Sequence, residues 1–180
     1  YELFKVLVMN DVRALEEILK SLNNSDKFDL ILTELFNTDI FLGFTYKYKA
    51  PVISLSSGQI MLWGTHRFGI PDNPAYIPTI ISSAADKMTF KEKLLNTYYY
   101  VALKRAFFNN RDEENLIVRT YFGDDTPLLQ ELAERTSLFL VNTHFSLTVP
   151  RPLPPQVIEV AGIHIKPKTT LPQDIEDFIN

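Results

Sequence analysis

Cysteine is absent from this chain of 180 residues, which excludes disulfide bonds, thiolate catalysis and cysteine-ligated zinc. Positive charge is not in excess, because 18 Lys and Arg stand against 22 Asp and Glu, and the formal net charge of −4 argues against a nucleic-acid partner. Long apolar runs are also missing. The longest, such as 28–32, have the size of a strand and fall short of the roughly 20 residues that cross a bilayer. The remaining composition is that of one globular domain.

A targeting segment is not visible at the start of the chain. The sequence opens at Tyr1 without an initiator Met, and neither a basic region nor an apolar stretch typical of a signal peptide follows. We expect either that such a segment has been removed or that the chain is an excerpt from a longer protein, and we favour the excerpt. The lack of cysteine leaves the cellular compartment open.

The first third of the chain alternates between helical and strand spacing. Apolar residues recur every three or four positions over 11–22, which predicts an amphipathic helix. Asn10 or Asp11 would cap it. A helix is also predicted between two short buried strands, and the order strand, helix, strand indicates a βαβ unit with parallel strands. These three elements are the strand Phe28–Thr33, the helix Asp39–Lys49 and the strand Pro51–Leu55.

A long segment without periodicity, Ser56–Lys87, follows the second strand. It is rich in proline and glycine but too apolar for disorder, so we expect it to pack on the body of the domain or to line a pocket. A capping box then starts a helix at Thr89, which runs towards Phe122 with a break near Asn109 and Asn110. The last predicted elements are a helix at Pro127–Arg135 capped by Thr126, a strand at Leu138–Asn142, a connector at Thr148–Gln156, a strand at Val157–Val160 and a helix at Gln173–Ile179.

This pattern predicts an α/β fold with a mostly parallel sheet flanked by helices. In such folds the ligand crevice lies beyond the carboxyl ends of the strands, which selects three groups of residues. They are Glu34 after the first strand, Ser56, Ser57 and Gly58 after the second, and Asn142, Thr143 and His144 after the third.

Each of these groups has a purely structural interpretation as well. Glu34 can be a solvated loop carboxylate, the serines a simple turn, and His144, like His66 and His164, a hydrogen-bonded loop histidine. Glu34 and Asp39 five residues apart are weak support for a magnesium site. No dinucleotide, P-loop, nucleophile-elbow or zinc-binding motif is present. Composition and spacing alone therefore stop at an α/β domain with a cleft at the strand ends.

Three ordered stretches carry a resemblance to a known family. The first is FDLILTE at 28–34 with APVISLS at 50–56, and the second is PDNPAYIP at 71–78 leading into MTF at 88–90. The third contains LVNTH at 140–144, PRPLPP at 150–155, GIHIKP at 162–167 and LP at 171–172. In these stretches the chain resembles the UDP-glycosyltransferase (UDP-glucuronosyltransferase-like) family, and its insect branch most closely.

The resemblance implies the two-domain GT-B architecture, in which an N-terminal Rossmann-like domain holds the acceptor and a C-terminal domain grips the UDP-sugar. Residues 1–180 are similar to the later part of the acceptor domain, and residues 57–88 to the long acceptor-side loop. The opening strands and the donor domain would lie outside this sequence. We therefore expect the full-length protein to be an enzyme and the 180 residues alone to be inactive.

Members of the family transfer a sugar with inversion to a small lipophilic hydroxyl acceptor. A histidine near the start of the acceptor domain takes the hydroxyl proton, and a nearby carboxylate steadies the imidazolium. The histidine position precedes this sequence. The carboxylate position falls on Glu34, where many relatives carry Asp, and the extra methylene of Glu alters the geometry of the pair.

The resemblance also implies binding residues. The acceptor pocket would involve Ser56, Met61, Trp63, Phe68 and Tyr76, because lipophilic acceptors need apolar walls with few polar groups. Donor-side residues would be Asn142, Thr143 and His144. UDP-glucose or UDP-glucuronate would serve as co-substrate, with no metal and no tightly bound cofactor. The expected partners are the acceptor, the donor domain of the same chain and possible further copies in a homo-oligomer, with no nucleic acid.

The sequence Asn23-Asn24-Ser25 forms an N-glycosylation sequon in a predicted turn. With the resemblance, it leads us to expect a glycoprotein on the lumenal side of the endoplasmic reticulum, held by a C-terminal membrane anchor outside these residues and active in detoxification.

Two other classes of function stay open. One is a non-catalytic lipophile-binding protein on the same scaffold, and the other is a receiver-like signalling domain, which the long apolar loop disfavours.

Overall fold

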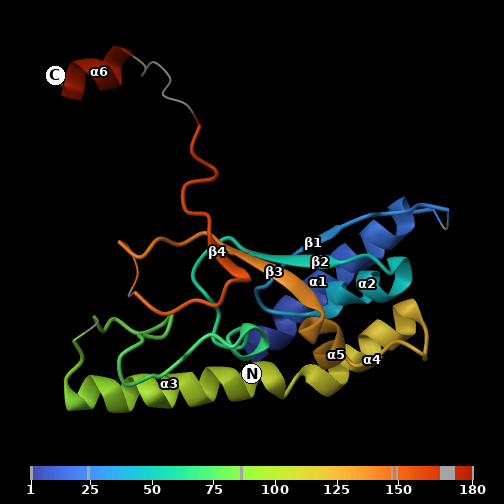
Figure 1. Cartoon of the computed structure of the whole chain (residues 1–180), viewed down its shortest axis with the longest axis horizontal. Helices are drawn as coiled ribbons and strands as arrows, with labels where there is room; N and C mark the ends of the chain where they lie inside the picture. The colour runs from blue at the N-terminus through green and yellow to red at the C-terminus, as the bar shows by residue number, and fades with distance from the viewer. Residues whose placement is uncertain are drawn as a thin grey trace.

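The computed structural model describes residues 2–23, 25–85, 87–146, 148, 150–166 and 173–179. Figure 1 shows the chain coloured from its N-terminus to its C-terminus. In chain order the elements are α1 (Glu2–Ser21), β1 (Ile31–Glu34), η1 (Ile40–Leu42), α2 (Gly43–Tyr48), β2 (Val52–Ser56), η2 (His66–Phe68), α3 (Phe90–Phe108), α4 (Arg111–Phe122), α5 (Leu129–Glu134), β3 (Thr136–Val141), β4 (Val157–Glu159) and α6 (Gln173–Ile179).

The four strands form one sheet in the order β1-β2-β3-β4, and every neighbouring pair is parallel. Glu34 is in register with Leu55, and Ser56 is in register with Val141. The carboxyl ends of β1, β2 and β3 therefore meet at one edge of the sheet. This architecture confirms the predicted α/β fold with a parallel sheet flanked by helices.

The helices enclose the sheet through two apolar clusters. One cluster joins the sheet to α3 and to the long loop after β2, with Trp63, Phe107 and Phe139 among its members. The other joins α1, η1, α2, α4 and α5, with Leu15 and Leu132 at its centre. Figure 1 shows α1, α2, α4 and α5 gathered at one end of the molecule, while α3 extends away from them along its lower edge.

The strand β1 corrects one sequence-based expectation. The run Phe28–Thr33 was expected to be covered on both faces, but the strand begins at Ile31 and its side chains alternate between half-buried and exposed. Leu32 is 61% exposed. Leu32 and Glu34 share one face of β1, and the described residues leave that face open to solvent. Uniform hydrophobicity indicates a strand but does not reveal which face a neighbour covers.

Several predicted boundaries are also wrong. The first helix begins at Glu2 instead of 11, so Asn10 and Asp11 lie inside it and cap nothing. The predicted helix Asp39–Lys49 divides into η1 and α2. Thr126 is not a cap: Leu128 occupies the N-cap of α5, and the Thr126 hydroxyl donates to the carbonyl of Gly123. Strand β3 begins two residues earlier than predicted and ends one earlier.

The start of α3 confirms the predicted capping box. The Thr89 side chain accepts from the backbone N–H of Glu92, whose carboxylate accepts from the backbone N–H of Thr89. The predicted break is also confirmed, since α3 ends at Phe108 and α4 begins at Arg111. The apolar segment between β2 and α3 packs on the body of the domain, as its composition predicted, with Ile60, Leu62 and Ile70 among its buried residues. Among the helices of the described residues, none has the length and apolar character needed to cross a membrane.

Candidate active site at the carboxyl end of β1

Glu34 is the last residue of β1, and its side chain is exposed where the strand ends. Strand β2 carries the chain to Ser57, whose hydroxyl donates a hydrogen bond to Glu34 Oε1 at 2.6 Å. The parallel register brings these two residues together, since Glu34 ends β1 and Ser57 directly follows the paired strand β2. The hydrogen bond orients one oxygen of the carboxylate and leaves the other available to a further donor.

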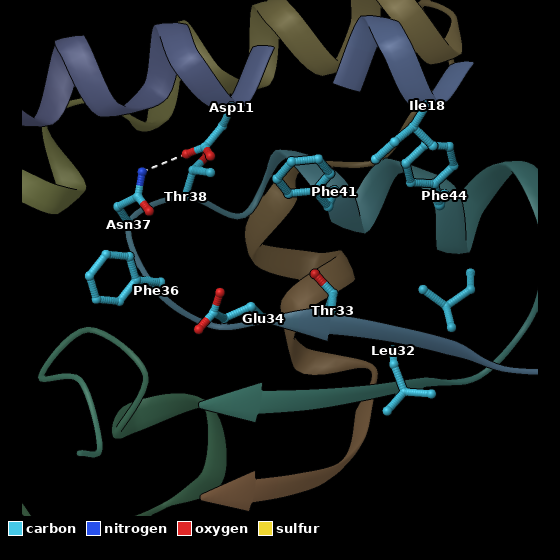
Figure 2. Close-up of a pocket in the computed structure, with 11 residues that line it drawn as sticks. Asp11, Ile18, Leu32, Thr33, Glu34, Phe36, Asn37, Thr38, Phe41 and Phe44 are labelled. Carbon is cyan, nitrogen blue, oxygen red and sulfur yellow. Dashed lines mark hydrogen bonds between the residues drawn. The ribbon is translucent and has the colours of Figure 1, made fainter. Parts of the chain in front are cut away.

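A pocket of about 360 Å³ lies beside Glu34, between β1 and α1. Figure 2 shows Glu34 at the tip of the strand, with Phe36 and Asn37 on the loop that follows and Asp11 above them on α1. Apolar rings and polar groups both contribute to the walls, a mixture suited to an organic ligand with few hydrogen-bonding groups. The lining residues are Asp11, Ile18, Ile31, Leu32, Thr33, Glu34, Phe36, Asn37, Thr38, Phe41 and Phe44.

Asp11 is a second carboxylate in this pocket. Its side chain accepts a hydrogen bond from the amide of Asn37, as Figure 2 shows. Burial raises the pKa of Asp11, the Asn37 hydrogen bond partly offsets this effect, and the nearby charge of Glu34 raises the pKa further. The position of Asp11 in this pocket has no signal in the sequence, where the residue is a predicted helix cap. Residue 11 reaches the pocket because α1 extends well beyond the predicted start.

The loop between β1 and η1 is fixed by the segment that follows β2. The indole N–H of Trp63 donates to the carbonyl of Phe36. Leu35 is buried, and a Cβ atom added to Gly64 would lie 2.5 Å from its Cδ2 atom. Any larger residue at position 64 would therefore displace Leu35, which is the neighbour of Glu34. Trp63 and Gly64 thus act on the candidate site through the backbone of its loop.

A buried ionic cluster fixes the far end of the same loop. The guanidinium of Arg67 donates from Nη2 to both oxygens of Asp39, at 2.7 and 2.6 Å, and Arg111 donates from its Nη2 to Asp39 Oδ2 at 3.2 Å. The three side chains are almost fully shielded from solvent. Asp39 therefore joins the loop of Glu34 to η2 and to α4, and charge-assisted hydrogen bonds of this kind are the strong ones in proteins.

Two titratable groups border this cluster. Burial raises the pKa of Glu114 to about 8, assisted by the charge of Asp39 and opposed by a hydrogen bond with Thr38 and the charge of Arg111. Burial also lowers the pKa of His66, and the positive charges of Arg111 and other basic neighbours add to the effect. At neutral pH, Glu114 is therefore protonated and His66 neutral, which limits the net charge enclosed in the protein.

The expected acceptor residues divide into buried and exposed side chains. Ser56 is buried and donates to the carbonyls of Gly58 and Gln59, at 3.4 and 3.1 Å, so Ser57 and not Ser56 contacts Glu34. Met61, Trp63 and Phe68 are buried in the apolar cluster that includes the sheet, and Tyr76 is exposed. None of these five residues lines the pocket beside Glu34. Their contact with an acceptor stays a prediction.

The expected donor-side residues follow β3. The Asn142 amide donates to the carbonyl of Ser57 at 3.0 Å and accepts from the backbone N–H of Gly162 at 3.3 Å. The Thr143 hydroxyl donates to Glu159 at 3.2 Å, and both residues line a pocket of about 220 Å³ at the ends of β3 and β4. Exposed His144 pairs its Nδ1 with the Ser146 hydroxyl at 2.7 Å. Only Asn142 is thereby linked to the Glu34 site, through Ser57.

Arg67 is a residue of this candidate site that no sequence feature indicated, whereas Ser57 was among the three residues selected at the end of the second strand. Ser57 was placed at the strand end, but Ser56 was preferred as its representative. The alternation of side chains along β2 could have separated them, since successive residues point to opposite faces. Arg67 carried no signal in the sequence, because its partner Asp39 lies 28 residues away.

The remaining titratable side chains form no second candidate site among the described residues. Within the described ranges, no cluster of three or more His, Asp or Glu side chains could hold a metal ion. His66 packs its ring edge-on against Phe108, and His164 is exposed.

Asn23 is exposed after α1, where its backbone N–H donates to Asp26 at 2.8 Å. Asn24, the middle residue of the sequon, lies outside the described residues.

Comparison with known proteins gives consistent matches. Residues 5–180 match the family described as "UDP-glucoronosyl and UDP-glucosyl transferase". "UDP-glucosyltransferase 2" of the insect Dactylopius coccus is 40% identical over 156 residues, which cover 86% of this chain and 30% of that protein. "UDP-glycosyltransferase UGT5" of the same organism is 43% identical over 163 residues, covering 88% and 31%. No solved structure shows a significant match.

A vertebrate relative shows the same coverage. "UDP-glucuronosyltransferase 3A1" of Bos taurus is 29% identical over 165 residues, which cover 91% of this chain and 31% of that protein. The chain thus spans about a third of the length of the relatives it matches. The match of the family to nearly every residue agrees with the parallel α/β fold and with the stretches noted in the sequence. The chain belongs to the UDP-glucuronosyl and UDP-glucosyl transferase family.

Proposed function

We propose that the full-length protein is a glycosyltransferase that moves a sugar from a UDP-sugar to a hydroxyl group of a small lipophilic acceptor. This segment would be the later part of the acceptor domain and would supply the acid of a histidine–acid pair. One observation carries the proposal: in a chain of this family, the exposed carboxylate of Glu34 stands at the strand-end crevice beside a pocket and is oriented by Ser57.

The proposed reaction is a displacement with inversion. The acceptor oxygen forms a bond to the anomeric carbon while the bond from that carbon to the UDP oxygen breaks, and UDP leaves with the bonding electrons. The acceptor proton passes to a histidine outside these 180 residues, and the carboxylate of Glu34 stabilises the imidazolium that results. The step needs no oxidant or reductant.

Substrate binding in this proposal draws on two regions. The pocket between β1 and α1, with Phe36 and Phe41 among its walls, and the long loop 57–88 with exposed Tyr76 are candidate acceptor surfaces. Asn142, Thr143 and His144 are candidates for the donor side, because they follow β3 at the same edge of the sheet. The similarity covers proteins named for glucosyl and for glucuronosyl transfer, so UDP-glucose and UDP-glucuronate are both candidate donors.

The direct test is product formation by the full-length protein. UDP-glucose and UDP-glucuronate are each offered with a panel of phenols and lipophilic alcohols, and the products are identified by mass spectrometry and by the anomeric coupling constant in proton NMR. The proposal expects a β-glycoside with one of the two donors. Saturable acceptor binding without product from either donor would instead support a lipophile-binding protein on the same scaffold.

We also propose a lumenal location in the endoplasmic reticulum for the full-length protein. The exposed position of Asn23 in its sequon supports this location, since oligosaccharide transfer needs an accessible asparagine in a lumenal segment. A glycosidase-sensitive shift in electrophoretic mobility that disappears in Asn23→Gln is the expected result. An unmodified protein in a cytosolic fraction would contradict this location.

A further inference from the structure

The middle of the long loop after β2 is fastened to α3 at two points. Residues 71–79, the strap, contain no helix or strand, so their buried backbone groups need partners outside regular structure. Asn96 on α3 supplies three of these partners. Its amide Nδ2 donates to the carbonyls of Pro74 and Ile77 at 2.7 and 2.8 Å, and its Oδ1 accepts from the backbone N–H of Thr79 at 2.8 Å. Figure 1 shows the loop beside the N-terminal half of α3.

The Asn96 side chain is completely buried, and this makes the three hydrogen bonds matter. An asparagine amide has two N–H donors and one carbonyl oxygen, and here every one of these groups pairs with the backbone of the strap. Since a buried polar group without its partner is costly, the strap and the amide of Asn96 hold each other in place.

A carboxylate forms the second fastening, at the start of the strap. Asp72 Oδ2 accepts from the Lys104 ammonium at 2.5 Å and from the Tyr100 hydroxyl at 2.8 Å, and both donors stand on α3. The Thr65 hydroxyl donates to the same oxygen at 2.7 Å. Charge-assisted hydrogen bonds of this kind are short and strong. The helix α3 therefore fixes the strap near both of its ends.

The strap forms one wall of the crevice at the carboxyl edge of the sheet. Its last residues, Pro78 and Thr79, line a pocket of about 270 Å³. This pocket shares three lining residues with the pocket of about 220 Å³ at the ends of β3 and β4, and these are Gln59, Thr148 and Arg151. The two pockets therefore adjoin, and the strap stands next to the candidate donor side.

The Thr79 hydroxyl indicates that this wall meets a ligand. Thr79 is 3% exposed, and its hydroxyl has no hydrogen-bond partner among the described residues. Buried hydroxyls normally have a partner, so a molecule bound in the adjoining pocket is the kind of group that would satisfy this one. Asn96 accepts from the backbone N–H of the same residue and thereby sets the position of the hydroxyl.

We propose that Asn96 is a positioning residue for acceptor binding, with Asp72 as the second anchor of the strap. Neither side chain touches the acceptor; both fix the strap, which carries Thr79 and the exposed Tyr76. The role of Asn96 rests on the proposed transferase function. Loosening the strap should weaken acceptor binding and leave both the chemistry at Glu34 and the binding of UDP-sugar unchanged.

Steady-state kinetics of the full-length enzyme test this role. The acceptor is 1-naphthol or, if that compound is not glycosylated, the member of the panel above that gives the most product. Asn96→Asp keeps the shape of the side chain but places an oxygen against the two carbonyls of the strap. The acceptor KM should rise about tenfold or more, while kcat and the KM for UDP-sugar stay within about threefold of wild type. Asn109→Asp makes the same substitution at the exposed end of α3 and should behave like wild type.

A second variant covers the case in which a buried carboxylate at position 96 prevents folding. Asp72 is partly exposed, and Asp72→Asn keeps its shape while removing the charge that pairs with Lys104. The acceptor KM should again rise, by about threefold or more, with kcat unchanged. Asp124→Asn removes an exposed charge after α4 and is the matched control, which should leave the acceptor KM at its wild-type value.

Hydrogen exchange followed by mass spectrometry reads the strap without any reaction. Amides of residues 71–79 in the full-length protein should exchange about tenfold faster in both variants than in wild type, while those of α4 exchange equally. Two results would overturn the role of Asn96 and leave the proposed function standing. One is an unchanged acceptor KM in folded variants of an active enzyme, and the other is unchanged exchange of the strap.

Failure of the proposed function gives a different result. If the full-length protein forms no product with either UDP-sugar, equilibrium dialysis with 1-naphthol replaces the KM. Binding about tenfold weaker in Asn96→Asp than in wild type then supports the role of Asn96. Equal binding by the two proteins, or no binding by wild type, overturns it.

Discussion

The hydroxyl of Ser57 and the carboxylate of Glu34 lie 2.6 Å apart, although 23 residues separate them in the chain. The parallel pairing of β1 with β2 creates this contact, which the local sequence around either residue does not predict. In the proposed reaction Ser57 acts as a positioning residue, since it holds the carboxylate that faces the histidine. This role can be separated from that of the carboxylate itself.

Removing the hydroxyl should therefore impair turnover without abolishing it. Ser57→Ala in the full-length enzyme is expected to lower kcat about tenfold, because a hydrogen bond to a charged group contributes roughly 1.5–3 kcal/mol. Ser57→Thr keeps the hydroxyl and should retain most activity. Ser137→Ala removes an exposed hydroxyl near the start of β3, at the opposite end of the sheet from the candidate site, and serves as control. Steady-state kinetics that show equal kcat for Ser57→Ala and wild type would remove Ser57 from the site.

The buried cluster around Asp39 should dominate the stability of the loop that follows Glu34. Asp39→Asn leaves two buried guanidinium groups without their counter-charge, and breaking a buried pair in this way costs about 3–5 kcal/mol. Asp124→Asn, an exposed residue in the turn after α4, should cost less than about 0.5 kcal/mol. Urea unfolding of the two variants measures the difference. A loss of less than about 1 kcal/mol in Asp39→Asn would show that the cluster does not stabilise the fold.

Glu114 should make stability depend on pH. Its pKa is raised to about 8 in the folded protein, above the value of 4.5 expected when unfolded, so the folded state binds the extra proton between these values. The free energy of unfolding should accordingly fall as pH rises from about 5 to 8. Glu114→Gln keeps the shape of the protonated acid and should flatten this dependence, with a gain over wild type at pH 8.5 of at most about 4–5 kcal/mol, the full linkage of a pKa raised from 4.5 to about 8.

Urea unfolding at pH 5.5 and pH 8.5 checks the sign of this effect. The titrations of all other groups are common to both proteins, whereas the interactions of Asp39, Arg111 and Asp11 with the charge of Glu114 exist in wild type alone, so the difference between the two curves reports Glu114 together with these interactions. Parallel pH curves for wild type and Glu114→Gln would contradict the assignment. Glu113→Gln, an exposed neighbour on α4, should follow the wild-type curve.

Local sequence patterns predicted the elements of this fold well where a chemical signal marks them. The capping box at Thr89 and the break at Asn109 were visible because their chemistry is contained within a few residues. The prediction that Thr126 caps a helix was wrong, because its hydroxyl donates to the carbonyl of Gly123 and caps no helix. The start of α1 was missed because residues 2–9 carry little turn or cap signal.

The candidate site was only half visible in the sequence. Glu34 could be found because a strand end is a local feature and the family resemblance falls on it. Ser57 could also be found as a strand-end residue, although its contact with Glu34 could not. Asp11 and Arg67 could not be found, because tertiary contacts bring them to the loop of Glu34 from distant parts of the chain. Burial was the other hidden property: Trp63 resembles a pocket wall in the sequence, but its ring stacks on Phe107 in the core.

The central claim is that the charge of Glu34 acts in catalysis, and one kinetic comparison tests it. Glu34→Gln keeps the size of the side chain and removes its charge. In the full-length enzyme this change should lower kcat by roughly 10²-fold or more, with about 10⁴ as the upper guide from the Ser-His-Asp triad. Glu34→Asp should retain substantial activity, and the KM for the UDP-sugar should stay the same in both variants. A Glu34→Gln enzyme that turns over like wild type would contradict the account and leave Glu34 as a loop carboxylate.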